Sequence, residues 1–212
     1  MIEETKTRLP ALAATVHDPH CRLLAGLRRV AEPLREVFGG LGILATTPTA
    51  DGVVAFLRDE LDAAVVQDSP GAGKVGKHRR EAVRAASTFD PSVILHSDLD
   101  HVLRWIETDK AELTETLADL PAEFVVIGRT PRSMNACPQR LQDTEAIVNH
   151  IYRLATGRPW DLMFAVRAMS PRAAAVVIEH GSEDTIANDV EWPVLVEQAG
   201  LSVGYREADG LS

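Results

Sequence analysis

The chain has 212 residues and a formal net charge of -9, with 45% apolar and 25% charged residues. This composition is ordinary for a globular protein, and its negative charge disfavours nonspecific nucleic-acid binding. No apolar run approaches the roughly 20 residues of a membrane-spanning helix, and the start, Met-Ile-Glu-Glu-Thr-Lys, does not resemble a signal peptide. Cys21 and Cys137 lie far apart and outside any metal-ligand spacing, which favours reduced thiols. We therefore expect a cytoplasmic protein without an integral membrane segment.

The first half of the chain alternates between apolar runs and helical patterns. The predicted strands are 9–16, 41–45, 63–67 and 92–96, and the helices between them are 23–37, 51–61 and 75–86. Such alternation predicts βαβ units and a mostly parallel sheet between two helix layers, that is, a three-layer α/β sandwich. No break in composition divides the chain, so we expect one domain over residues 1–212.

The second half is less regular. Residues 109–120 are predicted to be helical with Thr108 or Asp109 as the cap, and residues 130–140 to form a long loop, because prolines interrupt them. A polar connection is expected at 181–189. The other predicted elements are strands at 123–127, 161–168 and 201–206, and helices at 141–155, 171–178 and 191–199.

Two carboxylates follow the fourth predicted strand, in the segment Asp98-Leu99-Asp100. A buried strand delivers such side chains to the carboxyl edge of the sheet, where ligands collect in open α/β folds. A divalent cation relieves the repulsion between neighbouring carboxylates, so the pair predicts a Mg²⁺ or Mn²⁺ site. The alternative is that the aspartates cap the next helix.

Polar segments end the other three strands as well. They are His17-Asp18, Thr46-Thr47 and the glycine-rich loop 68–73. Right-handed crossovers place the carboxyl ends of parallel strands at one edge of the sheet. We therefore expect these segments and the Asp-x-Asp pair to converge on one crevice.

A basic stretch follows the glycine-rich loop and contains Lys74, Lys77, Arg79, Arg80 and Arg84. Free N–H groups and the dipole at a helix start favour anions, so the stretch predicts a phosphate or diphosphate site; the alternative is a solvated basic helix face. The same loop matches most of a P-loop, but His78 stands where a serine or threonine would bind Mg²⁺, and the loop follows the third strand. A P-loop NTP-binding protein is therefore a weaker interpretation.

Over nearly its whole length the chain resembles glycosyltransferases of the GT-A fold, in particular the group of dolichol-phosphate mannose synthase-like and polyprenyl-phosphate sugar transferases. Motifs at the four strand ends resemble that group's motifs, at 14–18, 46–51, 73–79 and 98–100. Downstream, Phe124–Arg129 resembles the strand before its acceptor region, and Asp161 with Arg167 its Asp-x-x-Ser-Gly-Phe-Arg motif. Residues 188–191 and 199–201 resemble its late acidic motif and closing strand.

The resemblance implies a metal-dependent transfer of a sugar from a nucleoside diphosphate to an acceptor that is unknown and is either small or lipid-linked. Asp100 would bind Mg²⁺ or Mn²⁺ directly, and Asp98 would contact the ribose, or the metal through water. Asp189, with Glu191 as the second candidate, would be the general base, unless Asp189 is only a helix cap. Lys74, Lys77 and Arg79 are the diphosphate candidates. The nucleoside candidates are His17, Asp18, Thr46, Thr47 and Asp51.

The sequence departs from the family pattern at two places. Thr46 and Thr47 replace paired aspartates in the region that contacts the nucleobase, and Ala165 replaces a glycine. A protein that has this fold but only binds a nucleotide, sugar or partner is therefore an alternative function. A nucleotidyltransferase is less favoured, because residues 14–20 contain no glycine.

Other polar and aromatic residues have two interpretations. His96, His101 and His180 are candidate further metal ligands or packing groups. Arg129 and Arg167 would either meet an anionic acceptor or pair with Asp161. Trp105, Trp160 and Trp192 are interpreted as core residues, and the alternative is that they stack on a sugar. A homodimer is compatible with the sequence.

Overall fold

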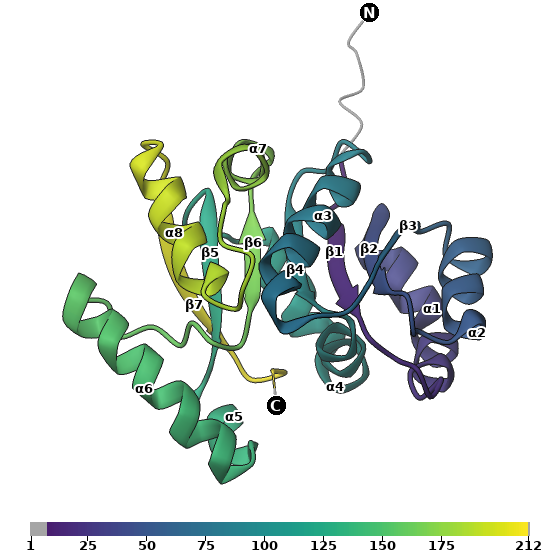
Figure 1. Ribbon diagram of the computed structural model, residues 1–212, viewed down its shortest axis with the longest axis horizontal. Helices are drawn as coiled ribbons and strands as arrows, with labels where there is room; N and C mark the ends of the chain where they lie inside the picture. The colour runs from purple at the N-terminus through teal and green to yellow at the C-terminus, as the bar shows by residue number, and fades with distance from the viewer. Residues whose placement is uncertain (1–7, 212) are drawn as a thin grey trace, which may run out of the picture.

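The computed structural model describes residues 8–211. The start of the chain, for which we expect no signal peptide, lies outside the described residues. One 7-stranded sheet runs through the protein in the order β3-β2-β1-β4-β6-β5-β7, and β6 is antiparallel to both of its neighbours. The arrowhead of β1 in Figure 1 marks the carboxyl edge. The strands are β1 (Ala11–Val16), β2 (Gly40–Thr46), β3 (Ala64–Asp68), β4 (Ile94–Asp98), β5 (Phe124–Arg129), β6 (Val166–Met169) and β7 (Val203–Ala208).

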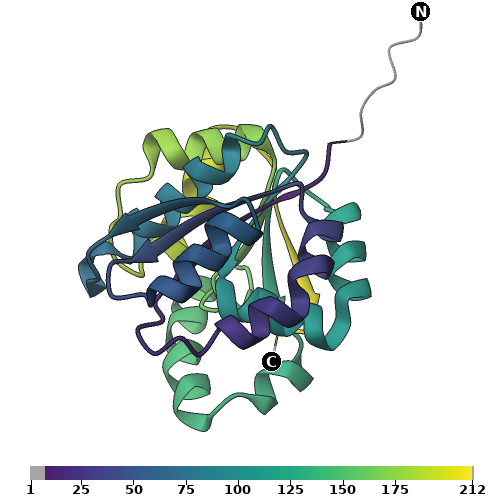
Figure 2. The ribbon, with the colours of Figure 1, turned by 90° about the vertical axis from the view of Figure 1, so that its right-hand side faces the viewer.

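Helices cover both faces of the sheet, which confirms the predicted three-layer α/β class (Figures 1 and 2). One core lies under α1 (Leu24–Val37), α2 (Asp51–Ala55) and α4 (Leu99–Ala118). The other lies under α3 (Val75–Ser87), α7 (Pro171–His180) and α8 (Asn188–Gln198). The short turns η1 (Phe56–Glu60) and η2 (Ala72–Lys74) precede β3 and α3, respectively. None of the helices within residues 8–211 combines the length and the apolarity that crossing a bilayer requires.

Helix α3 approaches the sheet closely because its neighbour in β2 has no side chain. A Cβ atom on Gly42 would lie 2.1 Å from the backbone nitrogen of Ala86, so a larger residue would push the helix away. Ala82, Val83 and Ala86 form the buried face of α3. The same close packing fixes where the first turn of α3 meets the carboxyl edge of the sheet.

The predicted helix at 109–120 is the second half of α4. Asp109 has a non-helical backbone, and its carboxylate accepts a hydrogen bond from the N–H of Glu112 at 2.9 Å, as the predicted cap should. The first half of α4, which begins at Leu99, was not predicted. Its buried Val102, Leu103 and Ile106 recur at helical spacing and carry the signal.

The predicted loop at 130–140 contains a helix, α5 (Pro131–Ala136). The hydroxyl of Thr130 accepts a hydrogen bond from the N–H of Ser133 at 3.2 Å, and Pro131 occupies the first turn. A threonine cap followed by proline is a helix start, so here proline begins an element that we expected it to exclude. The following α6 (Gln139–Thr156) begins before its predicted start and lies at the end of the molecule, beyond α8 and β7 in Figure 1.

The predicted strand 161–168 is shorter than expected, because β6 begins only at Val166. Ala165 has a left-handed backbone with φ of 61°, which explains why the family pattern places glycine there. Its carbonyl accepts a hydrogen bond from Nδ1 of His96 at 3.0 Å. The turn before β6 therefore fixes the orientation of that imidazole.

Ala165→Val should lower the free energy of unfolding by about 2–4 kcal/mol, because a β-branched side chain disfavours the left-handed backbone and overpacks the core. Ala165→Gly, which relieves the backbone but deletes a methyl group, should stay within about 1 kcal/mol of the wild type. Urea unfolding measures both values. Equal losses in the two variants would contradict the expected cost of a β-branched residue at this left-handed position.

Candidate functional site

A cleft of about 550 Å³ opens at the carboxyl edge of the sheet. Its lining comes from the ends of β1, β2 and β4, the loop after β3 and the first turns of α3 and α4. The four predicted strand ends thus meet as expected. The polar lining residues are Thr15, His17, Asp18, Arg22, Thr46, His78, Arg79, Asp98, Asp100 and His101.

Asp98 stands where β4 ends, next to β1 in the sheet. Its partner across the ladder is Thr15, whose hydroxyl donates a hydrogen bond to the carboxylate. Asp98 occupies the N-cap position of α4 but makes no capping hydrogen bond. Burial opposes ionisation, but the Arg79 guanidinium and the Thr15 hydroxyl outweigh it and hold the pKa of Asp98 below its usual range. The carboxylate is therefore ionised and held toward the cleft.

Asp100 lies in the first turn of α4. It is exposed, lines the cleft and has neither a hydrogen bond nor an ion pair with any residue between 8 and 211. Beside it, His101 stacks on Phe164 with ring centroids 4.3 Å apart, and its buried Nδ1 has no partner among the described residues. Asp100 is thus available to bind a ligand, unlike the other carboxylates of this region.

The polar groups at the ends of β1 and β2 are joined to each other. Nδ1 of His17 lies 2.7 Å from the hydroxyl oxygen of Thr46. Asp18 turns inward, where its carboxylate accepts hydrogen bonds from the N–H groups of Arg22 (2.9 Å) and Leu23 (2.8 Å). Burial opposes the charge of Asp18, but these backbone donors hold its pKa below the usual value. Asp18 therefore shapes the loop after β1, whereas His17 and Thr46 face the cleft.

The two lysines predicted to bind diphosphate are held by Asp68, at the end of β3. Its carboxylate lies 3.3 Å from Nζ of Lys74 and 2.8 Å from Nζ of Lys77. Nε2 of His78 approaches the same carboxylate at 3.4 Å. Neither lysine lines the cleft. Their contact with a diphosphate therefore stays a prediction, and the lysines share the single carboxylate of Asp68 outside the cleft lining.

Arg79 is the basic residue of α3 that reaches the cleft. It is buried, and its Nη1 donates to the side-chain oxygens of Asn188 and Asp189, both at 3.0 Å. Nη2 of Arg167 lies 3.4 Å from the same oxygen of Asp189. Asp189 does not line the cleft, so the structure does not place it where a general base would meet an acceptor. It is not a helix cap either, because α8 already begins at Asn188.

Three further site predictions fall outside the cleft. Glu191 accepts hydrogen bonds from the N–H groups of Ser182 and Glu183, both at 2.9 Å, and so closes a turn. Thr47 and Asp51 are exposed and do not contribute to the lining, because the chain turns away at Thr49 to start α2.

The histidines and tryptophans follow mostly the packing interpretation. His96 is buried with its ring edge on Trp192, and burial together with the Arg79 charge lowers its pKa to about 3. His180 is exposed at the end of α7. Trp105 and Trp192 are fully buried, as predicted, and Trp160 is half-buried against Tyr205.

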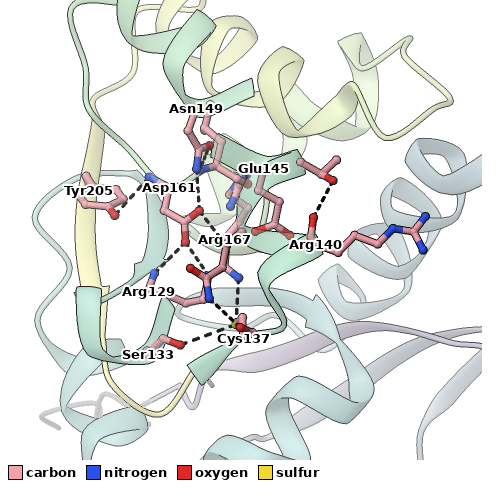
Figure 3. A network of polar contacts seen from close by, with 12 residues as sticks. Arg129, Ser133, Cys137, Arg140, Glu145, Asn149, Asp161, Arg167 and Tyr205 are labelled. Carbon is pink, nitrogen blue, oxygen red and sulfur yellow. Dashed lines mark hydrogen bonds and ion pairs between the residues drawn. The ribbon is translucent and has the colours of Figure 1, made fainter. Parts of the chain in front are cut away.

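A second cavity, of about 600 Å³, lies beside α5 and α6 and is lined by Arg129, Asp161, Trp160 and Tyr205 among others. Figure 3 shows the polar network around Arg129 and Asp161. The Nε of Arg129 donates to Asp161 at 2.8 Å, and its Nη2 pairs with Glu145. The pairing with Asp161 is thus confirmed for Arg129, whose charge faces two carboxylates, whereas Arg167 pairs with Asp189 instead.

Several lining residues were not predicted. Thr15 could have been found as the one polar residue in the apolar run 11–16, and Arg22 and His78 flank segments already singled out. Asn188 does not line the cleft, and its contact with Arg79 has no local signal, because it joins residues 109 positions apart. Within residues 8–211, no group of three or more histidine, cysteine, aspartate or glutamate side chains is arranged to hold a metal by itself.

Comparisons with known proteins give structural matches only. No family model matches the sequence, and no curated protein matches it. The crystal structure of Mycobacterium tuberculosis glucosyl-3-phosphoglycerate synthase matches with a TM-score of 0.59 and 11% identity, over 94% of this chain and 71% of that one. Its complex with Mn²⁺, UDP-glucose and phosphoglyceric acid matches with 0.58 and 11%, over 94% and 69%. Its complex with UDP matches with 0.57 and 12%, over 94% and 70%.

The chain has the GT-A fold. The long structural matches and the sheet order, with one antiparallel strand after the Asp-x-Asp strand, agree on this point. At 11% identity the likeness extends to the fold and not to a particular activity.

Proposed function

We propose that this protein is a metal-dependent glycosyltransferase, which moves a sugar from a nucleoside diphosphate to an acceptor. The observation that carries the proposal is the cleft itself, where Asp98 and Asp100 face Arg79 at the edge of a GT-A sheet. The named structural neighbours include a complex with UDP-glucose and Mn²⁺, which supports a nucleotide-sugar donor and a divalent cation here. The motifs of the dolichol-phosphate mannose synthase-like group support a lipid-linked acceptor as one candidate.

The donor groups present in the cleft fit a divalent cation. Asp100 offers an unpaired carboxylate, Asp98 an ionised one, and His101 an unpartnered buried nitrogen. Mg²⁺ is commonly held by one or two protein carboxylates together with substrate phosphates, which agrees with the lack of a larger ligand cluster in the described part of the chain. When bound, the cation would offset the negative charge of the diphosphate leaving group.

The residues of the chain itself bind and orient the donor. We assign the diphosphate to Arg79, whose guanidinium faces the same cleft as Asp98 and Asp100. His17 and Thr46 are the candidates for the nucleoside, because Thr46 stands where the related motif has an aspartate and because a hydrogen bond joins it to His17. As charge develops on the departing phosphate, a guanidinium that is already in place stabilises it without reorganising.

A nucleotide-binding protein without transfer activity is the second candidate. Both predicted general bases, Asp189 and Glu191, lie outside the cleft with their carboxylates engaged, which favours this alternative. The two candidates share the cleft and differ in turnover.

A thermal-shift panel of UDP-, GDP- and dTDP-sugars, each with and without Mn²⁺, tests the proposal. Ligand that binds the native state raises the melting temperature, and a hundredfold excess over Kd corresponds to roughly 2.7 kcal/mol. We expect a metal-dependent shift with one nucleotide and slow release of free sugar from that donor. A shift without any turnover, with or without acceptors, would favour the second candidate, and silence across the panel would contradict both.

A further inference from the structure

We infer that Asn188 and Asp189 are positioning residues that aim the Arg79 guanidinium at the diphosphate of the bound ligand. The inference rests on the proposed function only in taking that ligand to be a diphosphate. It replaces the expected role of Asp189 as a general base. It also assigns a function to the late acidic segment 188–191, which does not line the cleft but orients a residue that does.

The hydrogen bonds of Arg79 are all on one side of its guanidinium. Nη1 donates to Asn188 and Asp189, at 3.0 Å each, while Nε and Nη2 have no acceptor among the described residues. A guanidinium carries five N–H donors in a planar fork. Arg79 is only 4% exposed and still lines the cleft, so its unused donors have a ligand as their natural acceptor.

Asp189 is placed to hold arginines and not to accept a proton from an acceptor. It is 2% exposed and lies between the guanidinium groups of Arg79 and Arg167. Arg167 is fully buried and donates from Nη1 to the carbonyl of Val166 at 2.8 Å, which fixes the far side of the pair. A carboxylate in this position cannot reach a hydroxyl group in the cleft without leaving two buried cations unbalanced.

The backbone of the segment before Asn188 also packs closely against the start of α3. The N–H of Gly76 donates to the carbonyl of Asp184 at 2.7 Å, and a Cβ atom on Gly76 would lie 2.1 Å from the carbonyl oxygen of Glu183. Nη1 of Arg80 donates to that same carbonyl at 2.7 Å. Glu191 closes the turn at 182–183, so Asp189 and Glu191 both help to hold α3, and with it Arg79. We call these contacts of residues 183–191 with α3 the clamp.

Arg79 also shares the cleft with the Asp-x-Asp pair. Its guanidinium lines the same cleft as Asp98 and Asp100, and Asn188 and Asp189 hold it there. A fixed guanidinium beside two carboxylates is an arrangement suited to a cation-bound diphosphate.

Calorimetric titration of the full chain with pyrophosphate, UDP and UMP, each with Mn²⁺, tests the inference. Asp189→Asn and Asn188→Ala should each weaken pyrophosphate and UDP binding by about tenfold or more, and UMP binding by less than about threefold. Glu197→Gln serves as the matched control, because Glu197 lies on the same helix and pairs with Arg158 away from the cleft. Its affinities should equal those of the wild type.

A double-mutant cycle separates positioning from a merely structural role. If Asp189 acts through Arg79, the variant Arg79→Ala/Asp189→Asn should bind pyrophosphate no more weakly than Arg79→Ala alone. Circular dichroism checks folding, and Asn188→Ala carries the test if Asp189→Asn does not fold. Unchanged affinity with a lower rate would restore Asp189 as the base and overturn the inference, as would additive losses or a wild type that binds neither diphosphate. Binding without turnover would instead contradict the glycosyltransferase proposal and leave the clamp supported.

Discussion

Asp100→Asn should lower the turnover of the nucleotide-sugar donor by about 10²–10³-fold, because it removes a cleft carboxylate that has no partner among residues 8–211. An amide keeps the size of the side chain and can still contact solvent, so stability should change by less than about 0.5 kcal/mol at this exposed site. Steady-state rates over a range of Mn²⁺ concentrations measure the effect. The Mn²⁺ requirement should rise in the variant, since its ligand carries no charge.

Asp59→Asn provides the control for this measurement. Asp59 is exposed, lies in η1 and does not line the cleft, so its rate and Mn²⁺ dependence should match those of the wild type. A full rate for Asp100→Asn, with an unchanged Mn²⁺ dependence, would refute the assignment of Asp100 as the metal ligand.

The largest loss of stability should follow from Asp161→Leu. The side chain of Arg129 is fully buried and donates hydrogen bonds to the Asp161 carboxylate from Nε (2.8 Å) and Nη2 (3.0 Å) (Figure 3). Removing one partner of a buried ion pair typically costs about 3–5 kcal/mol, because the remaining charge stays buried. Glu145 remains to compensate part of the Arg129 charge, so we expect the lower half of that range.

Urea unfolding at neutral and acidic pH measures this loss. Burial opposes ionisation of Asp161, but the Arg129 hydrogen bond and charge hold its pKa below the usual value. A lowered carboxylate pKa stabilises the fold above the pKa of the unfolded chain, and this stabilisation is lost as pH falls through the folded value. Asp161→Leu should therefore lose less stability at pH 3 than at pH 7. Glu123→Gln, which breaks the exposed pair with Arg172, should cost less than about 1 kcal/mol at either pH.

The sequence predicts the sheet better than it predicts the site. Apolar runs mark each strand of the first half, and the rule for parallel strand ends brings His17, Thr46 and Asp100 together as expected. The helices within 99–108 and 131–136 were not predicted. The helical spacing within α4 competes with the interpretation of Asp98-Leu99-Asp100 as a metal motif. The capping signals of α5 compete with the prolines, which favour a loop.

The partners of the charged residues could not be predicted in the same way. Lys74, Lys77 and Arg79 all carry a positive charge in the same basic stretch, yet of these three only Arg79 lines the cleft. Its spacing of three, four and seven residues from the buried face of α3 is a local signal for this. No local pattern shows that Asp189 meets Arg79, because that contact depends on how α8 docks against α3.

The buried set of Arg79, Arg167 and Asp189 limits how this chain can diverge. Two guanidinium groups share one carboxylate, so a neutral residue at Asp189 would leave two buried cations without a counter-charge. A lineage can lose this carboxylate only together with or after its arginines, or through intermediates that tolerate such a defect. Drift at the surrounding surface is not bound in this way, so Asp189 should persist in descendants whose remaining sequence has become unrecognisable.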